Sequence, residues 1–146
     1  MPKITNISYG LFNFDIDSDI LESVEFKYKN EDHYKSYKEY DGKPVQIIPI
    51  LQIHHIVRSK NIPILKDGEN DEGKFLTARE RVVNILTGFD EGQNIKPIKL
   101  YNYENADESI SMFKLSAGCH RLHCSILYGF RSIPATVYEK KDCVFS

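Results

Sequence analysis

Four consecutive residues combine groups that can hold an anion with a group that can attack an electrophile. Gly118, Cys119, His120 and Arg121 follow a stretch in which apolar and polar residues alternate, as in a strand, and precede apolar residues at helical spacing. Glycine permits the backbone angles of a tight turn, and a second glycine, Gly129, is a stop signal for the helix. The sequence therefore predicts a strand, a glycine turn and a helix that begins at Cys119.

This turn has chemical consequences. The first N–H groups of a helix lack internal partners and carry the positive end of the helix dipole, so they attract anions. His120 and Arg121 add donors for phosphate oxygens, and the same field favours the thiolate form of Cys119. Each residue alone is ordinarily structural, but the combination favours a phosphate site beside a nucleophilic sulfur.

Composition limits the class of protein. A length of 146 residues suits one domain, and 41% apolar with 27% charged residues predicts a globular core. The net charge of −2 gives no basic surplus for nucleic acid, and we see no apolar run typical of a signal peptide or a membrane span. Three cysteines without a disulfide-type spacing favour a reducing, cytoplasmic setting.

The chain divides into an N-terminal extension, residues 1–43, that we expect to pack on the core, and a main domain over residues 44–146. Within the extension, alternation predicts a strand over residues 23–29, and tyrosine spacing predicts a short helix over residues 33–40.

The main domain is predicted to be α+β, with a small mixed sheet packed against a few helices. A capping-box pattern and an apolar face predict a helix over residues 77–89. A polar, glycine-containing stretch at about residues 59–74 is interpreted as an insertion. Strands are expected over residues 44–56, 96–101, 109–116 and 133–138.

The motif Gly118-Cys119-His120-Arg121, followed by a helix and then Ile133-Pro134-Ala135, resembles sulfiredoxin within the ParB/sulfiredoxin-like fold. Related members of that fold commonly keep Gly-x-x-Arg here but lack the cysteine. The resemblance covers roughly residues 45–139 without the insertion. It implies ATP-dependent reduction of cysteine sulfinic acid in a peroxiredoxin, with Mg²⁺ bound through the ATP phosphates and a thiol reductant.

The resemblance also implies roles for residues. Cys119 would attack the substrate sulfur, while Gly118, His120 and Arg121 would bind phosphates. On the helix over residues 77–89, Arg81 falls where the family has a phosphate-binding lysine, and Asn84 where it has a polar nucleotide contact.

Three positions qualify this resemblance. Gly88 replaces a family threonine on the same helix, and Ala117 replaces a glycine before the turn. Sulfiredoxins place an arginine beside the catalytic cysteine. By spacing, His55 matches that arginine, and Arg58 lies close enough in sequence to supply the charge instead.

Other functions compete with this interpretation. A ParB-like nucleotide-binding module would use the same turn, with Cys119 incidental. A small-molecule kinase on this fold would need a carboxylate base, for which the candidates are Glu80, Asp90 and Glu91. A zinc site would draw on Cys119, His120, His123 and Cys124 with His54 or His55, but these spacings on one helix do not converge, so we expect no metal site.

Overall fold

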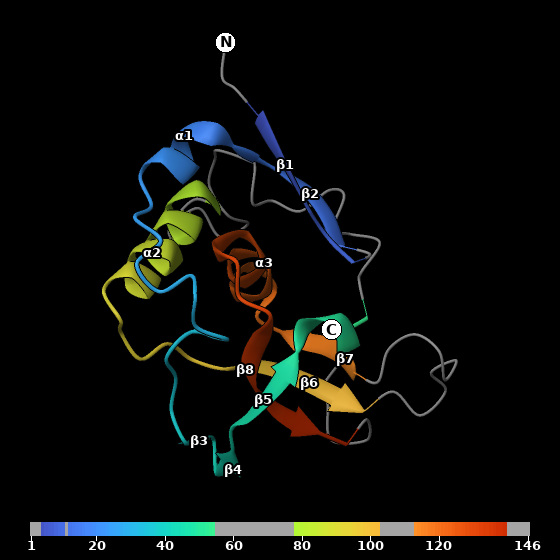
Figure 1. Ribbon diagram of the computed structural model, residues 1–146. Coiled ribbons are helices and arrows are strands. Elements are labelled where there is room, and N and C mark those ends of the chain that lie inside the picture. Colours follow the sequence, from blue (N-terminus) through green and yellow to red (C-terminus); the bar gives the residue numbers. More distant parts are fainter. Residues whose placement is uncertain (1–3, 11, 55–77, 103–112, 140–146) are drawn as a thin grey trace.

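A four-stranded mixed sheet lies on one side of the molecule (Figure 1). The computed structural model describes residues 4–10, 12–54, 78–102 and 113–139. The strand order is β5-β8-β6-β7, with β6 and β8 parallel and the other pairs antiparallel. The strands are β5 (Gln46–Pro49), β6 (Ile98–Asn102), β7 (Phe113–Ala117) and β8 (Ser132–Tyr138). Residues 132–136 of β8 are all buried, as expected for a strand that has neighbours on both sides.

Helix α3 (Cys119–Tyr128) lies at the centre of the molecule, between the sheet and the N-terminal elements (Figure 1). Every residue from Leu122 to Tyr128 is buried, so the helix is covered on nearly all sides. It ends at Gly129, whose φ of 101° lies in the left-handed region. Phe130 N–H donates to Ser125 O at 3.0 Å and Gly129 N–H to Ile126 O at 3.1 Å, which is a Schellman end. The predicted helix limits are confirmed.

Helix α2 (Ala78–Asp90) packs against α3 through Val82, Leu86 and Phe89, which are at most 3% exposed. These residues are the apolar face that the sequence predicts, and the helix agrees with the predicted one to within a residue at each end. The predicted cap, Thr77, lies outside the described residues.

The N-terminal residues contribute to the same core. Strands β1 (Ile4–Tyr9) and β2 (Phe12–Asp17) form an antiparallel hairpin, and the short helix α1 (Ser18–Glu22) follows. Phe12, Phe14, Ile16 and Ile20 are buried with the apolar residues of the sheet and of α3. The predicted α+β class, with a small mixed sheet packed against helices, is confirmed.

The strand predicted over residues 23–29 is wrong. Residues 27–30 form a turn, and Phe26 has a positive φ of 55°. The N–H groups of Glu25 and Lys27 donate to the Asp90 carboxylate, at 2.7 and 3.4 Å. Because these donors converge on one carboxylate, they do not form a strand ladder.

The helix predicted over residues 33–40 is also wrong. Ile95 N–H donates to Lys35 O at 2.9 Å, and the Ser36 hydroxyl donates to Ile95 O at 2.5 Å, so this segment is held by a loop distant in sequence. It continues into a hairpin of β3 (Glu39–Tyr40) and β4 (Lys43–Pro44).

The strand predicted over residues 44–56 is shorter than expected. Strand β5 ends at Pro49, and the 3-10 turn η1 (Ile50–Gln52) follows, with Ile53 N–H donating to Ile50 O at 3.0 Å. Ile50 N–H instead donates to Arg131 O at 2.9 Å, which fixes this turn against the end of α3.

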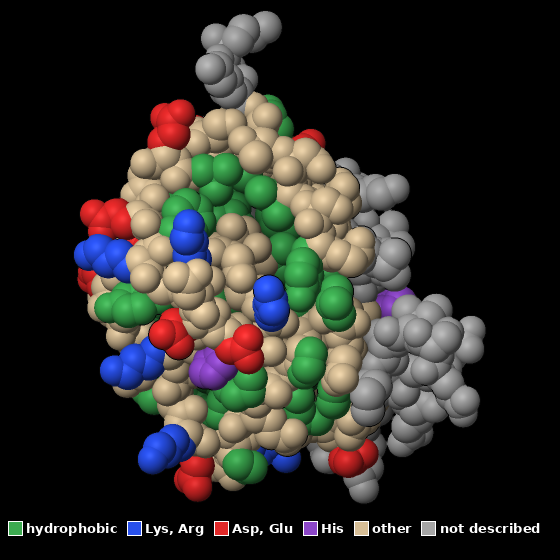
Figure 2. Space-filling model, in the orientation of Figure 1, with side chains coloured by type: hydrophobic (Ala, Val, Ile, Leu, Met, Phe, Trp, Pro, Cys, Tyr) green, Lys and Arg blue, Asp and Glu red, His purple; other side chains and the backbone are tan. Residues whose placement is uncertain are grey.

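On the face in Figure 2, acidic and basic side chains are interspersed with apolar ones. Among the helices of the described residues, none is long and apolar enough to cross a membrane.

Candidate functional site

Strand β7 and helix α3 meet at a single residue, Gly118. Its φ of 106° and ψ of 31° reverse the chain between Ala117 and Cys119 without any loop. A Cβ atom here would lie 2.7 Å from Ile98 Cγ2 on β6 and 3.1 Å from Arg121 Nη2. Only glycine satisfies both the backbone angle and the close approach. The sharp turn between β7 and α3, called the elbow below, therefore depends on Gly118.

Three backbone donors precede the first internal hydrogen bond of α3. The first bond at the start of α3 is Leu122 N–H to Gly118 O, at 2.9 Å. The N–H groups of Cys119, His120 and Arg121 come before it, and the glycine at the N-cap has no side chain to accept them. These three N–H groups therefore form a concentrated source of positive potential.

Two side chains add further donors at the same place. Within the described part of the chain, His120 Nε2 and Arg121 Nε are buried and have no hydrogen-bond partner. Arg121 Nη2 donates to Pro97 O at 3.4 Å, which keeps the guanidinium against the elbow. Buried nitrogens without partners are uncommon in proteins, and here they lie at the start of a helix, where the backbone N–H groups carry positive potential, which is the donor arrangement of an anion site.

A charged residue of helix α2, Arg81, influences the pKa of His120 at this site. Burial, and then the positive charge of Arg81, lower the pKa of His120 to about 4. His120 is therefore neutral at pH 7, and only one of its ring nitrogens donates. Arg81 on α2 and Arg121 on α3 thus both add positive potential at His120.

The other predicted contacts on α2 have different environments. Asn84 is exposed and lies one turn after Arg81, on the same face of the helix. Gly88 is buried, and a Cβ atom there would lie 3.0 Å from Ile95 Cδ1 and 3.3 Å from Gln93 Oε1. A side chain at position 88 would therefore crowd Gln93 and Ile95.

The two described cysteines differ sharply. Cys119 is partly exposed at the first position of α3, whereas Cys124 is fully buried one turn further on. Burial, reinforced by the neighbouring Cys119, raises the pKa of the Cys124 thiol well above its usual range. Cys119 is therefore the accessible sulfur of this helix, and Cys124 is a core residue.

Sequence reasoning considered His123 only as a zinc ligand and missed its contact with Cys119. The Nδ1 atom of His123 lies 2.8 Å from Cys119 O and 3.7 Å from Cys119 Sγ. The signal was the spacing of four residues on a predicted helix, which places the two side chains on one face.

Two predicted catalytic residues, His55 and Arg58, lie outside the described residues. The chain before them is placed by Ile53, which bridges Phe113 in parallel, and by His54 N–H, which donates to Phe113 O at 2.8 Å. Across the described residues, no group of three His, Cys, Asp or Glu side chains could hold a metal ion.

Asp90, one of the kinase-base candidates, has a structural role. Besides the N–H groups of Glu25 and Lys27, its carboxylate accepts the Tyr128 hydroxyl at 2.8 Å. Burial alone would raise the pKa of Asp90, but these hydrogen bonds together lower it below the ordinary value. A carboxylate stabilised in its charged form is a poor general base.

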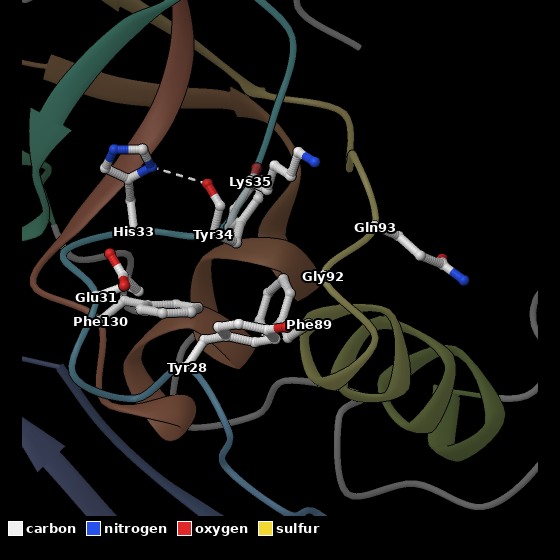
Figure 3. Close-up of a pocket in the computed structure, with 9 residues that line it drawn as sticks. All are labelled: Tyr28, Glu31, His33, Tyr34, Lys35, Phe89, Gly92, Gln93 and Phe130. Atoms are coloured by element: carbon white, nitrogen blue, oxygen red, sulfur yellow. Dashed lines mark hydrogen bonds between the residues drawn. The ribbon is translucent and has the colours of Figure 1, made fainter.

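A cavity of about 390 Å³ lies beyond the end of α2 (Figure 3). Its lining includes the rings of Tyr28, Tyr34, Phe89 and Phe130, and contains none of the predicted site residues. Tyr34 connects the two regions, because its ring stacks on Phe89 at 5.1 Å while its hydroxyl donates to Lys96 O at 2.7 Å, next to the carbonyl that Arg121 contacts.

Comparisons with known proteins give a structural likeness and no match by sequence. No family model matches this chain, and a search of curated proteins finds no match. Among solved structures, sulfiredoxin from Arabidopsis thaliana aligns over 66% of this chain and 89% of its own, with 16% identity and a TM-score of 0.41. At this identity and TM-score the match does not establish a shared function, and the residues at the elbow have to be judged on their own chemistry.

Proposed function

We propose that this protein is a sulfiredoxin-like enzyme that reduces cysteine sulfinic acid in a peroxiredoxin with the help of ATP. The observation that carries the proposal is the elbow itself. Buried side-chain nitrogens of His120 and Arg121 without a hydrogen-bond partner among the described residues follow a partly exposed thiol, Cys119, at the start of a helix. Few chemistries need a phosphate site and a sulfur nucleophile within one turn of helix, and sulfinate repair is one of them.

The donors at the elbow fit the phosphates of a nucleotide. Three backbone N–H groups and the Arg121 guanidinium would hold phosphate oxygens, and Arg81 would add charge from α2. His120, neutral at pH 7, would donate one N–H from a buried ring. A bound phosphate would raise the pKa of His120 again, so affinity should increase as the pH falls below 7.

Mg-ATP, when bound, supplies a γ-phosphate that turns a sulfinate oxygen into a leaving group, and Mg²⁺ would be carried by the ATP phosphates. The residues of this chain would position the phosphates and supply the attacking thiol. The elbow N–H groups and Arg121 would offset the charge on the phosphate, and Asn84 would contact the nucleotide from the exposed face of α2.

Cys119 would then attack the substrate sulfur. The field at the start of α3 favours a thiolate there, and the predicted charge from Arg58 or His55 would reinforce it. Cys124 cannot resolve the resulting sulfur–sulfur bond from its position, because it is fully buried in the core. We therefore expect an external thiol to complete the reaction.

The phosphate part of the proposal is tested by replacing Arg121. Arg121→Ala should weaken ATP binding by about 1.5–3 kcal/mol, the range for a hydrogen bond to a charged group. Arg131→Ala is a matched control, because Arg131 is exposed just past the end of the same helix. Calorimetry that gives equal affinities for Arg121→Ala and the parent would remove Arg121 from the site.

A further inference from the structure

His123 is a buried imidazole whose Nδ1 atom contacts Cys119. The residue is 0% exposed, and its ring lies edge-on to Phe12 and Phe14 of β2, at centroid distances of 6.0 and 4.9 Å. Its Nε2 atom is buried without a hydrogen-bond partner among the described residues. A fully buried histidine with one unsatisfied nitrogen needs an explanation.

The contact with the backbone fixes which nitrogen carries the proton. Nδ1 lies 2.8 Å from Cys119 O, and a carbonyl oxygen only accepts, so Nδ1 is the donor. Burial lowers the pKa of His123, and the hydrogen bond to Cys119 only partly opposes this, so the ring is neutral at pH 7. In a neutral ring with the proton on Nδ1, the basic lone pair is on Nε2, which faces away from the sulfur.

We infer that His123 is a positioning residue for Cys119, whose Nδ1–H is shared between the carbonyl and the sulfur and stabilises the thiolate. The Nδ1–Sγ distance of 3.7 Å is within hydrogen-bonding range for sulfur. The inference rests on the proposed function only in taking Cys119 as the reactive sulfur.

This role differs from that of a general base. To accept the Cys119 proton at Nδ1, His123 would have to lose its bond to the carbonyl and change tautomer. A charged imidazole would carry a second N–H at Nε2, which is buried and has no acceptor among the described residues, and this is costly. The pair is therefore a thiolate with a neutral donor, and not a thiolate–imidazolium ion pair.

Other charged and titratable groups surround the pair. His120, Arg121 and Cys124 lie on α3, Arg81 acts from α2, and β2 contributes only the rings of Phe12 and Phe14. A substitution at His123 leaves these groups in place, so its effect on Cys119 can be separated from the field of the elbow.

The test is the rate of Cys119 alkylation by iodoacetamide across pH 5–10, followed by peptide mass spectrometry on the full chain without nucleotide. In His123→Asn, the amide nitrogen takes the place of Nδ1, whereas in His123→Gln it takes the place of Nε2. We expect His123→Asn to stay within about twofold of the parent. We expect His123→Gln and His123→Leu to raise the apparent pKa of the reaction by about 0.5–1, which is about three- to tenfold slower labelling at pH 7.

Equal rates of Cys119 alkylation in the parent and the three variants would overturn the inference. A rate for His123→Asn as slow as that for His123→Leu would also overturn it. Labelling of Cys124 reports any loss of folding, since this thiol is fully buried in the native protein.

If a variant unfolds, ¹⁵N–¹H correlation spectra of the parent decide the question, because they distinguish the two imidazole tautomers. An Nε2–H tautomer or a charged ring at pH 7 would exclude the proposed donor. Neither readout needs sulfinate or ATP, so failure here is distinct from failure of the proposed enzyme activity.

Discussion

The elbow around Gly118 and the lead-in over residues 23–40 obtain their hydrogen-bond partners in opposite ways. At the elbow Leu122 N–H bonds to Gly118 O, and at the other end of the same helix Phe130 N–H bonds to Ser125 O, each within one or two turns of the chain. In the lead-in, Glu25 N–H reaches Asp90 and the Ser36 hydroxyl reaches Ile95, which are 65 and 59 residues away. The first region is built from local signals, and the second is built from the surface against which it packs.

This difference explains which predictions succeeded. Glycine at both ends of α3 and the apolar face of α2 act within a few residues, so their pattern in the sequence was sufficient. The alternation of Val24, Phe26 and Tyr28 suggested a strand, but the carboxylate of Asp90 binds the backbone of this segment. Tertiary contacts overrode local preference there.

The largest effect should come from removing the special backbone of the elbow. Gly118→Ala combines a left-handed φ, worth about 1–2 kcal/mol, with a clash against Ile98, worth about 1–3 kcal/mol. Gly42→Ala is the control, because its φ is also positive at 73° but a Cβ atom there would meet nothing within 4 Å. Urea unfolding should therefore show a loss of about 2–5 kcal/mol at Gly118 and only about 1–2 kcal/mol at Gly42. Equal losses would show that the elbow is not tightly packed.

A smaller loss of stability is expected when the lead-in is released. Asp90→Asn removes the charge that accepts Glu25 N–H, Lys27 N–H and the Tyr128 hydroxyl, and should cost about 1.5–3 kcal/mol of unfolding free energy. Glu91→Gln, at the exposed neighbouring position, should change stability by less than about 0.5 kcal/mol. ATP affinity should be unchanged in both variants, and a selective loss in Asp90→Asn would revive the kinase hypothesis.

The smallest effect is a pH dependence that arises at the elbow. The folded-state pKa of His120 is about 4 against an ordinary value of 6.5, so between these values the unfolded chain binds a proton that the native protein does not. Stability should therefore fall as the pH drops from 6.5 toward 4, with no contribution above 6.5. His120→Gln should flatten part of this slope in urea unfolding at pH 7 and pH 5, while His123, whose pKa burial also lowers, retains the rest. If the unfolding free energy of His120→Gln changes with pH as steeply as that of the parent, His120 is not buried as described.

The sequence was informative about the candidate site where residues act through neighbours. It predicted the position of Cys119 at the start of a helix and the donors of His120 and Arg121 beside it. It did not predict that His120 would be neutral, because that depends on burial and on Arg81 from another helix. The sequence also did not predict that Ile95 packs against Gly88, or that a cavity forms between the lead-in and the end of α2.

The central claim is that Cys119 is the nucleophile in sulfinate repair, and its most direct test is the loss of the sulfinic form of a peroxiredoxin, followed by mass. The assay compares the parent with Cys119→Ser in the presence of ATP, magnesium and a thiol reductant. The proposed phosphate donors are backbone groups, His120 and Arg121, so the serine variant should keep ATP binding and lose repair, because an alcohol is a far weaker nucleophile than a thiolate. A parent protein that binds ATP but leaves the sulfinate of several peroxiredoxins unchanged would contradict the account, as would a serine variant that repairs sulfinate as well as the parent.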